Sequence, residues 1–132
     1  MRTLPKLCTW TGMMFMLVIG AVHLIVSPHA FDDATYKGIL FLAGVIGAFF
    51  AAMGIQEGAL VRGWLLGTLV AGATLAGFVA NATVGLPGLQ ANPQIWLEPL
   101  GIIALMCEIL MLVVAFWAYE VAHHQARRLA NA

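Results

Sequence analysis

Four long stretches of the chain are almost wholly apolar, and polar residues gather between them. The stretches cover residues 8–27, 38–55, 64–84 and 99–119, each 18 to 21 residues long. A helix needs about 20 apolar residues to cross the hydrocarbon core of a bilayer. A backbone segment in lipid must satisfy its own hydrogen bonds, which favours the α-helix. The pattern therefore predicts an all-α, polytopic membrane protein: one domain over residues 1–132, built as a four-transmembrane-helix bundle.

Composition supports this class and removes others. Apolar types make up 62% of the chain and charged types 9%, against about 25% charged residues in an ordinary soluble domain. Six acidic and six basic residues cannot cover a water-exposed surface of this size. Glu108 is the one charged residue inside the four stretches. A net charge of zero offers no surface for nucleic acid, and two cysteines cannot build a disulfide scaffold.

Aromatic residues that carry one polar atom lie near the ends of the predicted spans. Such rings prefer the membrane interface, where the apolar body and the polar atom are both accommodated. The expected interfacial belt consists of Trp10, Tyr36, Trp64, Trp96, Trp117 and Tyr119.

Helix-breaking and capping residues mark the expected helix ends. Pro28 is expected to end the first helix, Asp33 to cap the second, and Pro99 to occupy the first turn of the fourth. The fourth helix is expected to continue beyond Tyr119 as a polar tail over residues 120–132 that lies against anionic lipid.

Basic residues predict the orientation in the membrane. Five of the six would lie on one side, Arg2, Lys6, Arg62, Arg127 and Arg128, and Lys37 alone on the other. Because cytoplasmic segments carry the excess of Lys and Arg, both termini are expected to be cytoplasmic. The loops 28–37 and 85–98 then face outward, and the second is expected to cover the mouth of the bundle.

Small residues recur every four positions in the second and third spans. Such stripes let membrane helices approach closely. One stripe in the second span contains Ala43, Gly47 and Ala51, and the third span has Gly72, Ala76 and Ala80 beside Ala73, Gly77 and Asn81. We therefore expect a tight contact between these two helices.

Polar residues inside the spans form the candidate site. Glu108, His23 and Asn81 each share a helical face with small residues, and Thr74 lies on the face of Asn81. Side chains lean toward the start of their own helix, which brings Glu108 outward and the other two inward. Above this predicted buried polar cluster lies an outer rim of His29, Asp32, Asp33 and Glu98.

This cluster has two interpretations. It is either a polar cavity that opens outward, for protons, a small ligand or a metal, or a hydrogen-bond cluster that fixes helix packing or contacts another subunit. No Lys or Arg lies in any span. Glu108 is therefore either protonated, paired with a protonated His23, or paired with a cation from another chain. A neutral Glu108 is the expected form because charge at the bilayer centre costs about 2.5–3.5 kcal/mol.

The sequence predicts no cofactor, and metal or haem stay open alternatives. His23 and His29 are the candidate metal ligands, but their spacing matches no known ligand signature. A haem held by two histidines needs them on facing helices, and only His23 lies inside a span.

Two short motifs resemble a group of small bacterial four-helix integral membrane proteins of uncharacterised function. One is His23-Leu24 with Pro28, His29 and Phe31; the other is the run Thr83-Val84-Gly85-Leu86-Pro87-Gly88 with Glu98 and Glu108. The resemblance implies a bacterial plasma (inner) membrane protein and implies no activity.

These features favour a small plasma-membrane subunit, without catalysis of its own, that acts in a larger membrane assembly. Its expected partners are the lipid bilayer and other membrane chains or further copies of itself. Two alternatives are a homo-oligomeric transporter or proton-coupled carrier that uses Glu108, and a metal- or haem-binding redox membrane protein.

Overall fold

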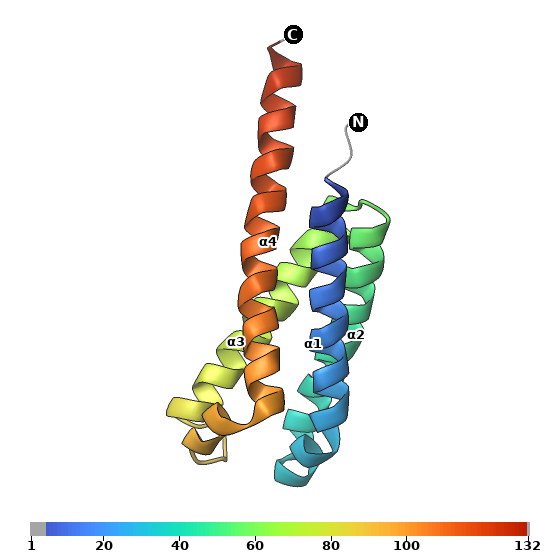
Figure 1. Ribbon diagram of the computed structural model, residues 1–132. Helices are drawn as coiled ribbons and strands as arrows, with labels where there is room; N and C mark the ends of the chain where they lie inside the picture. The colour runs from blue at the N-terminus through green and yellow to red at the C-terminus, as the bar shows by residue number, and fades with distance from the viewer. Residues whose placement is uncertain (1–4, 132) are drawn as a thin grey trace.

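The computed structural model describes residues 5–131, and these are helical almost throughout (Figure 1). The elements are α1 (Lys6–Asp33), α2 (Thr35–Gln56), the π-helical turns η1 (Leu60–Leu65), α3 (Leu66–Thr83), the 3-10 helix η2 (Pro93–Leu97) and α4 (Pro99–Ala130). The described residues contain no strand. The predicted all-α class with four long helices is confirmed. Arg2, counted in the charge bias, and the last residue of the tail lie outside the described residues.

The four long helices run alternately up and down, and each packs on two neighbours. α1 packs most extensively on α2 and also contacts α4, while α3 contacts α2 and α4. α1 and α2 lie side by side, and α3 crosses the bundle obliquely (Figure 1). α1 and α3 therefore each lie between α2 and α4.

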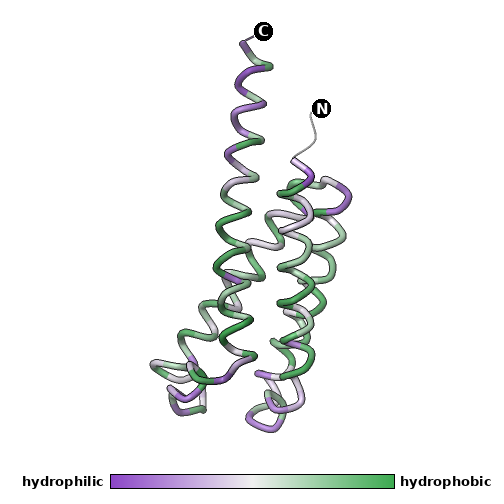
Figure 2. Tube along the Cα trace, viewed as in Figure 1, coloured by the Kyte–Doolittle hydropathy of each residue, from purple (hydrophilic) through white to green (hydrophobic). Residues whose placement is uncertain are grey.

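All four helices are long and apolar enough to cross a membrane. These candidate spans are Lys6–Asp33, Thr35–Gln56, Leu60–Thr83 and Pro99–Ala130. Only 22% to 33% of the residues in their most apolar stretches are buried within the chain, so most apolar side chains face outward. Apolar residues fill the middle of the bundle and polar residues gather at both ends (Figure 2). This distribution is consistent with an integral membrane protein, because a soluble protein would place polar side chains on that surface.

Pro28 does not end the first helix, which corrects the expectation from the sequence. α1 continues through it to Asp33. A proline inside a helix cannot donate to the carbonyl four residues earlier, which here is Leu24. The Ser27 hydroxyl donates to that carbonyl instead, at 2.8 Å. The helix therefore keeps the carbonyl satisfied.

The other predicted helix ends differ in outcome. Asp33 does not cap α2: it is the last residue of α1 and pairs with Lys37, while Ala34 precedes α2 without a side-chain cap. Pro99 occupies the first turn of α4, as predicted. α4 also continues as a helix beyond Tyr119, up to Ala130.

Trp64 is not part of an interfacial belt. Its side chain is fully buried, and the ring lies against Gly12, where an added Cβ would come within 2.7 Å of its edge. The sequence places Trp64 near a helix end but does not say which way it points. Trp10, by contrast, is 61% exposed, as an interfacial residue would be.

The contact between α2 and α3 forms only in part as expected. A Cβ on Gly47 would lie 2.8 Å from the Val70 side chain, so these helices do approach closely there. Gly72 and Gly77 face open space instead. The prediction that the small residues of α3 pack against α2 is therefore wrong at these two positions. The most extensive helix pairing is between α1 and α2, where Gly20 faces Ala48.

The connection from α2 to η1 is a backbone-on-backbone contact. A Cβ on Gly54 would lie 2.6 Å from the Gly63 backbone nitrogen, and one on Gly63 would collide with the Gly54 backbone in turn. Gly58 makes the reversal between them with φ of 73°. This close approach sets the position from which Trp64 enters the core.

Candidate functional site

His23 is held in one tautomer by its own helix. It lies on α1, is 8% exposed, and places Nδ1 2.9 Å from the Ile19 carbonyl oxygen. A carbonyl oxygen only accepts, so Nδ1 carries the proton and donates. In a neutral ring, Nε2 then has a free lone pair. Phe41 of α2 lies beside the ring, with the two centroids 5.0 Å apart.

Glu108 faces this lone pair from α4. The residue is 1% exposed, and its Oε1 lies 4.0 Å from His23 Nε2. This separation is within ion-pair range and about 1 Å longer than a hydrogen bond. Oε2 is buried and has no hydrogen-bond partner among residues 5–131. His23 Nε2 is therefore the polar group that α1 brings to the Glu108 carboxyl.

α2 and α3 close the cluster with a glycine and a threonine. A Cβ on Gly44 would lie 3.7 Å from both His23 Cδ2 and Thr74 Cγ2, so the missing side chain of Gly44 makes room for both. Thr74 lies near the Glu108 carboxyl, and its hydroxyl donates to the Val70 carbonyl at 2.8 Å. All four long helices thus contribute to one polar cluster.

The pair can hold one proton in two ways with the same total charge. A protonated Glu108 can donate to the free Nε2, or the proton can sit on His23 and leave an ion pair. Both forms are neutral overall, which avoids a net charge in an apolar interior. Of the three states expected for Glu108, the two that involve only its own side chain and His23 fit this geometry.

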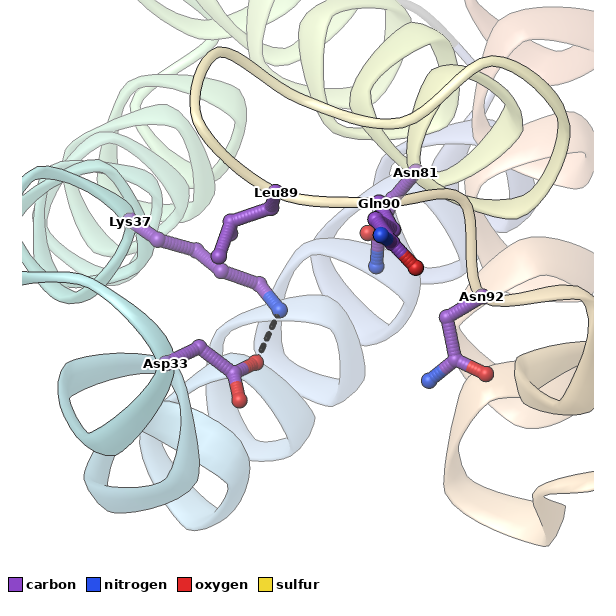
Figure 3. Close-up of a pocket in the computed structure, with 6 residues that line it drawn as sticks. All are labelled: Asp33, Lys37, Asn81, Leu89, Gln90 and Asn92. Carbon is purple, nitrogen blue, oxygen red and sulfur yellow. Dashed lines mark hydrogen bonds and ion pairs between the residues drawn. The ribbon is translucent and has the colours of Figure 1, made fainter.

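Asn81 does not join this cluster. It lies near the end of α3 and lines a pocket at the end of the bundle, together with Asp33, Lys37 and three residues of the loop 85–98 (Figure 3). Its backbone oxygen accepts from the Asn92 backbone at 2.8 Å. The structure therefore brings His23, Thr74 and Glu108 together and places Asn81 elsewhere. We call this second feature the outer-end pocket, because it lies at the end of the bundle that the distribution of Lys and Arg predicts to face outward.

The predicted outer rim is not a continuous ring around a cavity. His29, Asp32, Asp33 and Glu98 are all exposed. Asp33 alone of the four lines the outer-end pocket. Its pairing with Lys37 was missed from the sequence, although the four-residue spacing of opposite charges is a recognisable signal. A second missed contact is the Tyr36 hydroxyl, which donates to the Pro87 carbonyl at 2.7 Å.

Neither histidine candidate lies in a metal-binding group. Within residues 5–131, no three His, Cys, Asp or Glu side chains are placed to hold one ion. His23 is buried beside Glu108, whereas His29 is exposed near the end of α1. The two candidate histidines therefore do not come together at one site in the described residues.

Comparison of the chain with known protein families, with curated proteins and with solved structures finds no match. The resemblance to small bacterial four-helix membrane proteins stays a prediction from short motifs.

Proposed function

We propose that the chain is a small integral membrane subunit, without catalysis of its own, that acts with other chains in a larger membrane assembly. The observation that carries this proposal is the free-standing end of α4. Ala118 is the last buried residue of this helix, yet the helix continues to Ala130. At 1.5 Å per residue, residues 120–130 extend about 16 Å further. Figure 1 shows this end projecting past the other helices.

This helical extension gains nothing from tertiary packing within the described residues, although packing supplies most of helix stability in proteins. The projecting segment is mainly polar, and its own ion pair joins His124 to Glu120 at 3.6 Å. It continues in line with a candidate span, so in this conformation it points away from a lipid surface rather than lying on it. Another chain is the surface on which it packs.

Native mass measurement of the complex extracted in mild detergent tests this proposal. We expect partner chains with the full protein and their loss from a chain that ends at Tyr119, while the shortened chain keeps its helical content. A matched control is Glu120→Gln, which removes the ion pair of the segment and keeps its length. Full protein that runs only as a single chain, or only with copies of itself, contradicts the proposal.

We further propose that the protein resides in a bacterial plasma membrane with both termini in the cytoplasm. The basis is the five-to-one distribution of Lys and Arg between the two sides. Reporter fusions after Gln56 and at the C-terminus should then read cytoplasmic, and one after Gln90 should read external. An external C-terminus would overturn the orientation.

A second candidate function is a proton-coupled carrier that uses Glu108. The specific observation in its favour is that Glu108 Oε1 faces the free Nε2 of His23 in the middle of the helices. Purified protein in vesicles with a trapped pH dye tests it. Glu108→Gln should fold and assemble normally yet abolish proton movement; proton movement at the wild-type rate in this variant rejects the carrier.

A further inference from the structure

The outer-end pocket is a polar cavity of about 170 Å³ between the two halves of the bundle. Asp33, the last residue of α1, and Lys37, in the first turn of α2, form one side. The amides face them from the end of α3 and the loop that follows (Figure 3). The lining residues are Asp33, Lys37, Asn81, Leu89, Gln90 and Asn92. The two sides are distant in sequence, so the pocket exists only in the folded bundle.

Backbone and side-chain hydrogen bonds hold the walls in place. The Tyr36 hydroxyl ties the start of α2 to Pro87 in the loop. The Asn92 backbone nitrogen donates to the Asn81 carbonyl at 2.8 Å, and Asn92 Oδ1 accepts from Gln94 at 3.2 Å. The pocket is therefore built by contacts that leave most of its lining side chains free.

The lining side chains keep both hydrogen-bond donors and hydrogen-bond acceptors available for a ligand. The Lys37 ammonium donates to Asp33 Oδ2, and within residues 5–131 its other N–H groups and Asp33 Oδ1 have no side-chain partner. The side chain of Lys37 is only 12% exposed, whereas that of Asp33 is 52% exposed. An ammonium group therefore points its donors into the pocket beside an accessible carboxylate, with amide groups opposite.

The pocket has no net charge, which favours a ligand without net charge. Asp33 and Lys37 cancel, so a ligand with net charge would leave one charge unbalanced in a half-buried site. A ligand that carries both an ammonium and an anionic group matches both residues at once, because charge-assisted hydrogen bonds are the stronger ones. The amides of Asn81 and Gln90 can donate to the anionic group.

We propose that the outer-end pocket binds a zwitterionic ligand with a primary ammonium and a nearby anionic group, such as a phosphoethanolamine headgroup. The ammonium donates to Asp33 Oδ1, and the anionic group accepts from Lys37 and the amides. The pocket is lined by residues at the end of the bundle where α1 meets α2 and α3 meets the loop 85–98, and polar residues gather at both ends of the bundle (Figure 2). Such an end is the level of lipid headgroups around a membrane-spanning bundle. A free amino acid offers the same chemistry from solution.

Lipid binding to the purified full chain in detergent tests this proposal. Native mass spectrometry compares phosphatidylethanolamine, phosphatidylcholine and phosphatidylglycerol with identical acyl chains. We expect phosphatidylethanolamine to bind about tenfold more tightly than the other two, because a quaternary ammonium cannot donate to Asp33 and glycerol brings no positive charge. Equal binding of the three lipids overturns the proposal.

Two variants that alter the charge of the pocket should change its lipid preference, and a purely structural role of these residues would leave that preference unchanged. Asp33→Asn leaves the pocket with a net positive charge, so its preference should shift from phosphatidylethanolamine to phosphatidylglycerol. Lys37→Gln should weaken the binding of phosphatidylethanolamine about tenfold. Asp32→Asn is the matched control, because Asp32 is exposed next to Asp33 and does not line the pocket. If Asp33→Asn keeps the same lipid preference as Asp32→Asn, the proposal is wrong.

Free phosphoethanolamine and glycine distinguish the two sources of the ligand. Added to protein depleted of lipid, they should bind more weakly than the lipid if the headgroup is the ligand. Tighter binding of glycine, lost in Asp33→Asn and Lys37→Gln, supports the zwitterion and assigns it to solution.

Discussion

The His23–Glu108 pair should show energetic coupling between α1 and α4. The changes are Glu108→Leu and His23→Leu, each alone and both together, and Glu108→Gln serves as a separate conservative variant. Glu108 is 1% exposed, and the polar groups beside its carboxyl within the described residues are His23 Nε2, at 4.0 Å, and the Thr74 hydroxyl. Leu replaces the carboxyl with an apolar group of similar size, so it changes the polar contact with little change of volume.

The magnitude follows from what each variant leaves unpaired. Glu108→Leu leaves the buried Nε2 of His23 without a polar partner, which lowers the free energy of unfolding by about 1–3 kcal/mol. The same change also removes the unpartnered Oε2. Hydrogen bonds between membrane helices contribute about 0.6 kcal/mol on average and at most about 1.7. We expect a net loss of about 1–2 kcal/mol in the free energy of unfolding. The double variant should lose less than the sum of the two single ones, because it strands no polar atom.

Reversible unfolding in mixed micelles measures all four proteins of this cycle. We expect a coupling energy of about 1 kcal/mol and a Glu108→Gln variant close to wild type, since its amide can donate to Nε2. Single-variant losses that add within about 0.3–0.5 kcal/mol would refute the reasoning, because independent sites behave in that way.

Three further changes test local contacts. Gly63→Ala should lower the unfolding free energy by about 1–3 kcal/mol, since its Cβ would meet the Gly54 backbone, whereas Gly72→Ala, which faces open space, should be neutral or stabilising. Ser27→Ala should cost about 1 kcal/mol in thermal unfolding, because Pro28 cannot replace the lost donor; no loss contradicts this role. Tyr36→Phe should raise hydrogen exchange in the loop 85–98 about fivefold, and an unchanged rate would show that the loop does not depend on Tyr36.

The existence and order of the four helices could be predicted from the sequence because hydropathy alone decides them. Helix ends were less predictable, since they depend on single hydrogen bonds. Pro28 shows the reason. Proline stops most helices, but here the neighbouring Ser27 hydroxyl satisfies the carbonyl of Leu24. The residue before the proline therefore supplies the hydrogen bond that the proline cannot.

The place of a residue along the sequence also does not tell whether its side chain points toward the core of the bundle or away from it. Trp64 lies near a helix end, as interfacial residues do, yet it fills the space above Gly12. Apolar residues cover every face of these helices, so the sequence carries little contrast between the face toward lipid and the face toward the core. Polar residues restore that contrast, and for this reason His23 and Glu108 were correctly placed on inward faces.

Asn81 was misplaced because the sequence does not reveal the angle at which two helices cross. Thr74 and Asn81 lie on one face of α3, seven residues apart, which corresponds to about 10 Å along the helix axis. α3 crosses obliquely (Figure 1) and is close to α2 where Val70 meets Gly47 and Thr74 meets Gly44. Further along, Gly77 already faces open space. A single crossing angle therefore divides one predicted cluster into two: the buried His23–Glu108 pair, and a polar pocket at the end of the bundle to which Asn81 belongs.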